Sequence, residues 1–200
     1  MKAGITIDLL RHGETEGGNR FRGSTDDPLT STGWEQLNAA VERSNRNWDC
    51  IITSPLQRCA AFAESVAQQY QRPITYDERF QEMHFGEWEG RSAAELFETD
   101  PDALTRFWED PLHNTAPAGE ALTDFQSRVL EAWQELVNGH TAKRVLLVTH
   151  GGVIRVLLCD LLKRPLSNLL SFEVKHASLH ELQLDRHGDP LSNSIVERNA

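Results

Sequence analysis

The apolar run at residues 145–149 stands directly before a histidine and two glycines, and it limits the possible folds more than any other segment. A short apolar run with no polar alternation predicts a strand that is buried on both faces, and such strands occur in parallel sheets covered by helices. Residues 153–162 then follow with the character of a helix. This strand, loop and helix predict an α/β fold with a mostly parallel sheet.

Two earlier segments repeat the pattern of a strand followed by a turn and a helix. Residues 5–10 and 50–53 are predicted strands, and the helices after them are expected to begin near residue 31 and near residue 55. Thr30 and its polar neighbours offer N-caps for the first helix, while Ser54 and Pro55 offer a cap and a first-turn proline for the second, which runs to about residue 70. Further strands are predicted at 178–184 and about 194–196.

The middle of the chain has a different composition, because residues 81–140 mix aromatic residues with prolines and many acids. We predict a mainly helical cap inserted over one end of the sheet, with a loop at 110–119. The whole chain, 1–200, is then a single domain, a three-layer sandwich with a core of about 1–80 and 141–200 and a cap of about 81–140. The large aromatic side chains of the cap are expected to lie in the core; they are Trp88, Phe97, Trp108 and Trp133.

Charge and composition argue against several classes of protein. With 20 Lys and Arg against 30 Asp and Glu, the net charge of −10 opposes binding to nucleic acid. No apolar stretch approaches the roughly 18 residues of a membrane span. The cysteines at positions 50, 59 and 159 are odd in number and lack metal-ligand spacing, which predicts reduced thiols in a cytoplasmic protein. The sequence leaves the oligomeric state open.

The turns after the predicted strands carry cationic and histidine side chains. The first turn contains Arg11 and His12, the second is followed by Arg58, and the third contains His150 and Gly151. Because ligands bind outside the carboxyl ends of the strands of an open α/β sheet, these residues are expected to converge. Guanidinium groups and the N–H groups of a helix N-terminus both bind phosphoryl oxygens, so the expected ligand is a phosphate.

Phosphoryl transfer also requires a nucleophile and a proton donor. A neutral imidazole is a nucleophile, and cations around His12 should favour its neutral form. Glu82, at the start of the aromatic segment, is the candidate donor of a proton to the leaving oxygen. The arginines would neutralise phosphoryl charge without a metal or any other cofactor, and the expected partner is a small phosphomonoester.

Five blocks in this order resemble the histidine phosphatase (phosphoglycerate-mutase-like) superfamily; they are residues 11–15, 20–23 with 27–30, 54–58, 82 with 85–90, and 149–152. The resemblance covers nearly the whole chain. It implies a phosphohistidine intermediate on His12 and a phosphate pocket of Arg11, Arg58 and His150. It also implies that Glu82 protonates the leaving oxygen and then acts as the base for water, and it implies no metal.

One departure from the superfamily pattern lies in the first loop. Many members carry an asparagine where this chain has Gly18, and Asn19 is a possible substitute. Arg22, Gly23 and His84 are further candidates for contact with substrate. Arg22, like Arg20, is equally compatible with a solvated loop held by ion pairs, and His84 with a hydrogen-bonded cap residue. Glu14 is expected to order the phosphate loop. The remaining histidines have no motif context and are expected to be surface or core fillers; they are His113, His140, His176, His180 and His187.

Details of the loops resemble the α-ribazole phosphatase branch, which acts in assembly of the nucleotide loop of cobalamin. The chain also lacks the long insertion of cofactor-dependent mutases, so a phosphatase acting on α-ribazole 5′-phosphate, or on the cobalamin 5′-phosphate, is favoured. A sugar-phosphate or broad-specificity phosphatase and a phosphoglycerate mutase remain alternatives within the superfamily. Outside it stand a non-catalytic phospholigand-binding module and a metallohydrolase using His12, His84 and His150, which the nearby arginines disfavour.

Overall fold

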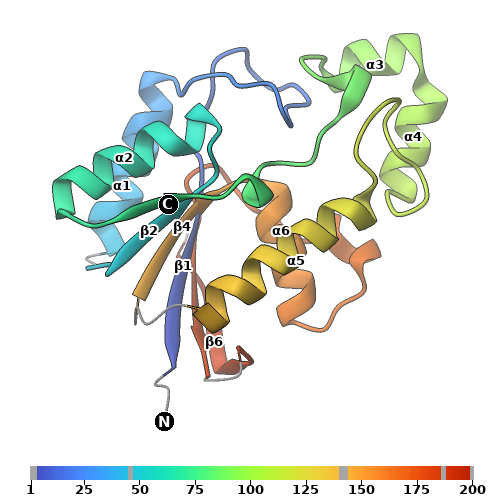
Figure 1. Cartoon of the computed structure of the whole chain (residues 1–200). Helices are drawn as coiled ribbons and strands as arrows, with labels where there is room; N and C mark the ends of the chain where they lie inside the picture. Colours follow the sequence, from blue (N-terminus) through green and yellow to red (C-terminus); the bar gives the residue numbers. More distant parts are fainter. Residues whose placement is uncertain (1–3, 45–46, 140–143, 186–187, 199–200) are drawn as a thin grey trace.

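A central sheet organises the computed structural model, which describes residues 4–44, 47–139, 144–185 and 188–198 (Figure 1). The strand order is β3-β2-β4-β1-β5-β6, with β4 parallel to β1 and to β2, and β3 parallel to β2. β5 and β6 add an antiparallel pair at one edge. This confirms the mostly parallel sheet. The strands are β1 (Ile5–Arg11), β2 (Cys50–Thr53), β3 (Ile74–Tyr76), β4 (Arg144–Thr149), β5 (Leu179–Leu184) and β6 (Pro190–Arg198).

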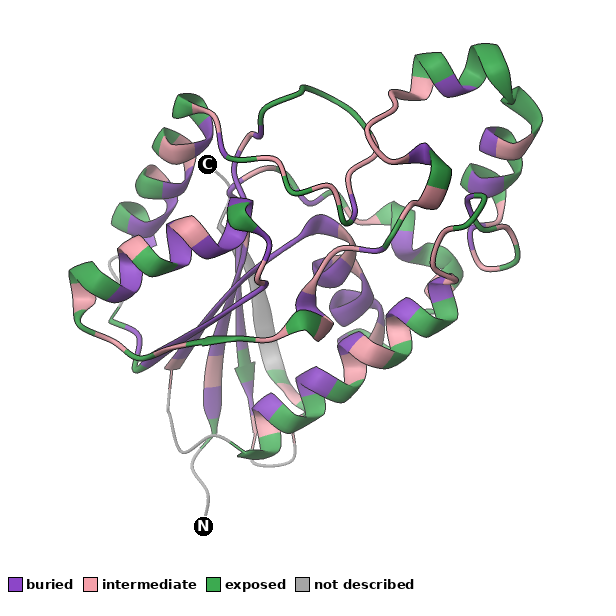
Figure 2. Ribbon diagram, turned by 45° about the horizontal axis from the view of Figure 1, so that its top comes forward, coloured by how far each residue is buried: buried purple, intermediate pink, exposed green. Residues whose placement is uncertain are grey.

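Helices cover both faces of the sheet. Successive residues of β4 point into different cores, since Leu147 packs in one apolar cluster and Leu146 in the other. The helices α1 (Ser31–Ser44) and α2 (Gln57–Tyr70) complete one core, and α5 (Leu122–Gly139) and α6 (Gly151–Leu161) complete the other. Figure 2 shows the central strands β1, β2 and β4 buried between these layers, with the outer helix faces exposed. The three-layer α/β architecture follows from β4 being apolar on both sides.

The starts of the first two helices differ in how well the sequence predicts them. Thr30 caps α1, because its Oγ1 accepts a hydrogen bond from the N–H of Gly33 at 2.9 Å. The prediction for α2 was wrong in detail: the helix begins at Gln57, its N-cap is Leu56 without a side-chain cap bond, and Pro55 lies before it. The hydroxyl of Ser54 instead contacts a buried histidine ring, described below.

The strands at the sheet edges are harder to predict than the central ones. β3 was not predicted, because it has only three residues and two of them, Thr75 and Tyr76, are exposed. The two late strands are confirmed, with β5 starting one residue later than expected and β6 extending well beyond residues 194–196. Edge strands have one neighbour, so their apolar pattern is weaker.

The segment expected to form the cap contains two different parts. The helices α3 (Ala93–Thr99) and α4 (Pro101–Glu109) stand beyond the end of the sheet, beside the loop that follows β1 (Figure 1). Ser92 and Glu95 form a capping box on α3, and Asp100 caps α4 ahead of Pro101. By contrast, α5 lies in the layer of α6. The boundaries of the cap at about 81 and 140 stay a prediction.

Three short 3₁₀ helices complete the described elements: η1 (Glu78–Phe80), η2 (Gly86–Trp88) and η3 (Leu166–Ser171). The predicted loop at 110–119 separates α4 from α5. The three cysteines are buried and form no disulfide, as expected from their spacing. None of the helices in the described part of the chain combines the length and the apolar composition that a membrane crossing needs.

Candidate active site

His12 follows the last residue of β1 and is fixed by its own backbone. Its N–H donates to the carbonyl of Thr149 at the end of β4, 3.0 Å away, and its carbonyl accepts from the N–H of Ala177 at 3.1 Å. The ring Nδ1 lies 2.7 Å from the carbonyl oxygen of Gly13. A carbonyl can only accept, so Nδ1 carries the proton and the lone pair is on Nε2. The ring is 6% exposed and lines a cavity.

The surroundings of His12 hold the imidazole neutral. Burial lowers its pKa well below the ordinary value, and the positive charges of Arg11 and Arg58 lower it further. The expectation that cations would favour the neutral form is confirmed in direction, although burial is the larger cause. A neutral ring with Nε2 unprotonated has the form that a nucleophile requires.

The cavity has a volume of about 750 Å³ and opens at the carboxyl ends of the strands. Of the residues predicted for the site, it brings together Arg11, His12 and Glu82 with Asn19 and Arg22. Arg58 and His150 do not line it, because both are fully buried beneath it. The turns therefore converge in two layers, a cavity lining with Arg11 and His12 and a fully buried support with Arg58 and His150.

Arg11 lines the cavity and is fixed there by one backbone hydrogen bond. Its Nη1 donates to the carbonyl of Val174 at 2.6 Å, while its Nε is buried without a hydrogen-bond partner. Burial lowers the pKa of Arg11 to about 10, with Glu82 opposing that shift, so the guanidinium stays charged at neutral pH. A Cβ added to Gly151 would lie 3.4 Å from that Nε and 2.9 Å from Nη1 of Arg155. Gly151, also predicted to bind phosphate, is therefore buried between two guanidinium groups at the start of α6 and does not line the cavity.

Arg58 and His150 form the buried support. Arg58 lies in the first turn of α2 and its Nε donates to Nδ1 of His150 at 3.3 Å. Because that nitrogen accepts, Nε2 of His150 carries the proton, 2.8 Å from the hydroxyl oxygen of Ser54. The rings of His150 and His12 lie 5.4 Å apart. Burial, and then the charge of Arg58, lower the pKa of His150 well below its ordinary value, so this ring is neutral too.

Glu82 lies at the amino end of α6, across the cavity. Its Oε2 accepts a hydrogen bond from the N–H of Gly152 at 2.9 Å, and its Oε1 accepts one from the N–H of Met83 at 3.0 Å. The first interaction places a carboxylate at the positive end of a helix. Glycine at position 152 makes room for Glu82, because a Cβ there would overlap the Glu82 carboxylate.

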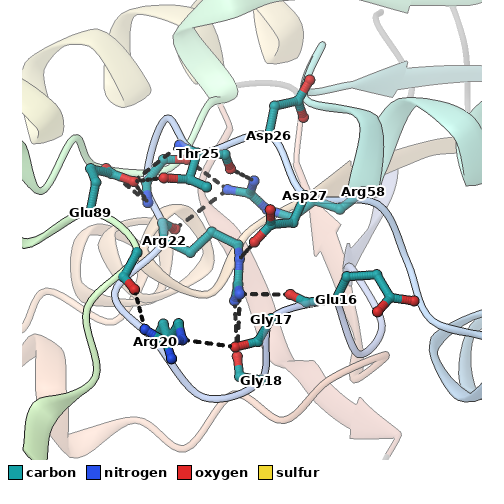
Figure 3. A network of polar contacts seen from close by, with 12 residues as sticks. Glu16, Gly17, Gly18, Arg20, Arg22, Thr25, Asp26, Asp27, Arg58 and Glu89 are labelled. Atoms are coloured by element: carbon teal, nitrogen blue, oxygen red, sulfur yellow. Dashed lines mark hydrogen bonds and ion pairs between the residues drawn. The ribbon is translucent and has the colours of Figure 1, made fainter.

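The loop between β1 and α1 is held both by its own side chains and by side chains from other parts of the chain (Figure 3). Arg22 donates to the carboxylate of Asp27 at 2.6 Å and to the carbonyls of Glu16 and Gly18. Arg20 donates to the carbonyl of Gly17 within the loop (Figure 3). Outside the loop it donates to the carbonyl of Gly90 and to the carboxylate of Glu95. Arg22 also lines the cavity. This residue therefore both forms an ion pair within the loop and contributes to the cavity wall.

Glu89 fixes the same loop from the other side (Figure 3). Its carboxylate accepts from the N–H groups of Gly23, Ser24, Thr25 and Phe85 and from Oγ1 of Thr25. Arg58 donates to the carbonyls of Gly23 and Thr25 at 2.7 and 2.6 Å. Residues 23–25 thus lie between the Glu89 carboxylate, which accepts hydrogen bonds from their N–H groups, and the Arg58 guanidinium, which donates to the carbonyls of Gly23 and Thr25.

The candidates for contact with the rest of the substrate lie in different places. Asn19 is exposed and lines the cavity. Gly23 is buried behind the cavity in the loop between Glu89 and Arg58, and a Cβ there would collide with the carbonyl of Met83. His84 is exposed and lies off the cavity lining, with its Nδ1 accepting from the N–H of Gly86 at 3.2 Å. That hydrogen bond matches the alternative of a hydrogen-bonded cap residue.

The histidines outside the motifs lie in different environments. His176 was expected to be a filler, and this was wrong: it lines the cavity with its ring 5.5 Å from that of His12. It lies in the turn before β5, a position that spacing in the sequence does not mark. His113 is on the surface and His180 is buried in β5, as expected. His140 and His187 lie outside the described residues.

Aromatic side chains form part of the cavity wall. Phe21, Phe85 and Trp108 line it, and Trp108 is 47% exposed, so the expectation that it lies in the core was wrong. Phe97 is also exposed, whereas Trp88 and Trp133 are buried as expected. Glu14 accepts a hydrogen bond from Oγ1 of Thr30 at 3.0 Å, which fits its expected ordering role. No group of three His, Cys, Asp or Glu residues within the described ranges is arranged to hold a metal ion.

The chain belongs to the histidine phosphatase superfamily, branch 1, whose family model matches residues 7–194. The fold agrees with that assignment. The solved structure of Bacillus stearothermophilus YhfR superposes with a TM-score of 0.86 at 34% identity, covering 94% of each chain.

Three of the curated relatives are named as phosphatases, each of a different substrate. A glucosyl-3-phosphoglycerate phosphatase from Mycolicibacterium vanbaalenii is 34% identical over 80% of this chain and 75% of its own length. The adenosylcobalamin/alpha-ribazole phosphatase of Escherichia coli is 29% identical over 83% of both chains. A putative phosphoserine phosphatase 2 from Hydrogenobacter thermophilus is 28% identical over 88% of both. The family is therefore settled and this chain is a phosphatase of that superfamily.

Proposed function

We propose that this chain hydrolyses phosphomonoesters through a phosphohistidine intermediate on His12 and without a metal. The observation that carries the proposal is the hydrogen bond from Nδ1 of His12 to the carbonyl of Gly13, since it leaves the lone pair of Nε2 for phosphorus. In the first step Nε2 forms a bond to phosphorus as the bond from phosphorus to the ester oxygen breaks. Charge on the phosphoryl oxygens is met by Arg11, with Arg58 beneath.

Glu82 completes both halves of the reaction in this proposal. In its protonated form it gives its proton to the leaving oxygen, and the alcohol departs. The resulting carboxylate then takes a proton from water as the water oxygen attacks phosphorus, which breaks the bond to Nε2 of His12 and releases inorganic phosphate. Glu82 ends the cycle protonated and His12 ends it neutral. The position of Glu82 on the lining of the same cavity as His12 supports this division of roles.

For the substrate we propose α-ribazole 5′-phosphate, or the 5′-phosphate of cobalamin, in assembly of the cobalamin nucleotide loop. Two observations support this substrate. The E. coli relative carries the name adenosylcobalamin/alpha-ribazole phosphatase, and the cavity presents Phe21, Phe85 and Trp108 to a bound ester. Aromatic walls suit a ligand with a planar aromatic base. We also place the protein in the cytoplasm, with a small-molecule partner and no nucleic acid or membrane partner.

The mechanism is tested by His12→Ala, with His113→Ala as the matched control because His113 is an exposed histidine far along the chain. His12→Ala should abolish hydrolysis of p-nitrophenyl phosphate, while His113→Ala should retain it. Turnover that survives in His12→Ala would contradict the mechanism. Wild-type turnover that disappears on adding a chelator would contradict metal independence.

The substrate is tested by comparing kcat/KM for α-ribazole 5′-phosphate, phosphoserine, glucosyl-3-phosphoglycerate, 3-phosphoglycerate, a fructose bisphosphate and a nucleoside monophosphate, because discrimination is a ratio of these values. We expect α-ribazole 5′-phosphate to have the highest value. A higher value for any other ester would reassign the substrate within the superfamily. Absence of hydrolysis of all six would favour a phospholigand-binding module.

A further inference from the structure

A second, smaller cavity of about 170 Å³ adjoins the first on the far side of Glu82. The two cavities share wall residues, and these are Phe21, Glu82, Phe85 and Trp108. The second cavity extends from there under α5, α6 and the 3₁₀ helix η3. The second cavity thus adjoins the first along a shared wall that includes Glu82.

The lining of the second cavity is apolar apart from two charged side chains. Its inner wall holds Phe107, Phe125 and Leu169, which are 7%, 1% and 7% exposed, and its outer wall is formed by Leu170, which is 50% exposed. The two charged groups are Glu82 and Arg155. Arg155 donates from Nε to the carbonyl of Phe172 at 2.9 Å and is held on the wall by that bond. Because the rest of the lining is apolar, a ligand group that fits this cavity is itself apolar.

Aromatic rings make the shared wall rigid. The rings of Phe21 and Phe85 meet edge to face at 5.2 Å, and Phe107 meets Phe85 at 6.3 Å and Trp88 at 5.3 Å. Rings fixed in this way offer edges and faces to a further ring. A cavity of about 150 Å³ lined by apolar side chains is known to hold benzene, so the space here suits a group of one or two rings.

We infer that the second cavity is the subsite for the alcohol part of the ester, and that it takes an apolar, ring-sized group. The inference rests on the proposed function: if Glu82 protonates the leaving oxygen, the alcohol must be bound at Glu82, and the space beyond Glu82 is this cavity. Esters of small polar alcohols such as serine would leave its apolar walls exposed to water. Esters whose alcohol carries an apolar group would cover them.

The test uses phosphonates, which lack the scissile ester bond, so that binding is measured apart from turnover. Dissociation constants of methyl-, butyl- and benzylphosphonate are measured by calorimetry with the wild-type protein. If the cavity takes the organic group, Kd should fall by about fourfold for each added methylene that is buried. The variant Leu170→Ser should weaken this dependence, since Leu170 forms the outer wall and, being 50% exposed, is not needed for folding.

Leu162→Ser is the matched control, because Leu162 has a similar exposure of 42% but lies at the opposite end of α6 from Glu82. It should keep the wild-type dependence on chain length. A Kd that is equal for all three phosphonates while p-nitrophenyl phosphate is hydrolysed would overturn the subsite and leave the proposed function standing. Equal effects of Leu170→Ser and Leu162→Ser would also overturn it. Binding that depends on chain length in a protein without phosphatase activity would instead refute the proposed function and keep the cavity as an apolar binding site.

Discussion

The carboxylate of Glu82 accepts a hydrogen bond from the backbone N–H of Gly152, 2.9 Å away at the start of α6. A helix N-terminus favours negative charge, so this contact holds the carboxylate where an anion is stabilised. In the proposed reaction Glu82 is protonated when the ester binds and ionised when the alcohol has left. The contact with Gly152 therefore favours the product side of the first step.

Gly152→Ala tests this contact. A Cβ at position 152 would overlap the Glu82 carboxylate, so the side chain must move and the proton donor is misplaced. We expect kcat/KM for ethyl phosphate to fall by about tenfold or more, as for loss of a positioned acid. Gly139→Ala is the control, because a Cβ there meets nothing within 4 Å at the end of α5. Equal rates for the two variants would show that Glu82 does not depend on Gly152.

Glu82→Gln tests the role of the carboxyl group. An amide keeps the size of the side chain but has no proton to give, so esters with poor leaving groups should lose about 10²–10⁴-fold in kcat/KM. Esters of p-nitrophenol need little protonation and should lose much less. The comparison uses kcat/KM because it excludes the later hydrolysis of the phosphohistidine. Equal losses for ethyl and p-nitrophenyl phosphate would contradict the role of Glu82 as the acid.

Glu89→Gln tests the loop clamp. Burial alone would raise the pKa of Glu89, but hydrogen bonds from Thr25 Oγ1 and the nearby backbone N–H groups outweigh it and lower the pKa below 4.5. The carboxylate therefore stabilises the fold above about pH 4.5, and this contribution is lost as the pH falls through the lowered pKa.

At neutral pH, Glu89→Gln should reduce the free energy of unfolding by about 1–3 kcal/mol. The reason is that the substitution removes a charged acceptor and leaves several backbone N–H groups less well satisfied. The difference from the wild type should shrink in acid. Urea unfolding at several pH values measures it, with the exposed Glu87→Gln as control. A difference that stays constant, or grows, as the pH falls would show that the ionised carboxylate is not what fixes residues 23–25.

His176→Ala tests the histidine that spacing did not reveal. Burial, and then the charge of Arg11, lower the pKa of His176 to about 4. Its ring is therefore neutral at neutral pH, and it shields His12 from water without adding a charge. Its removal would admit water to His12 and let the pKa of His12 rise toward its ordinary value. The acid limb of the kcat/KM profile should move to higher pH in His176→Ala and return in His176→Gln. An unchanged profile in both variants would remove His176 from the site.

The central strands and the motif residues were predictable because their physical signals are local. An apolar strand such as residues 145–149 is recognisable without its neighbours, and the turn after it places His150 by sequence position alone. The positions of Arg58 and His150 beneath the cavity were not predictable. They depend on the carbonyls of residues 23–25, which are fixed by Glu89 from a distant part of the chain.

The wall of the cavity also could not be read from the sequence. Trp108 has the character of a core residue, and only the position of α4 beyond the sheet exposes it to the cavity. His176 enters the site because the end of β1 and the turn before β5 are joined by the bond from Ala177 to His12. Both positions depend on tertiary contacts between elements, whereas the motifs identify only the residues within each turn.

The most direct measurement is to identify the phosphorylated residue during turnover. Wild-type protein is mixed with excess p-nitrophenyl phosphate, quenched in alkali within the first turnover, digested and analysed by mass spectrometry, with His12→Ala and His113→Ala treated in parallel. The account predicts an acid-labile phosphoryl group on the peptide that contains His12, present in the wild type and His113→Ala and absent from His12→Ala. Turnover without any adduct, or an adduct on another residue that persists in His12→Ala, would contradict it.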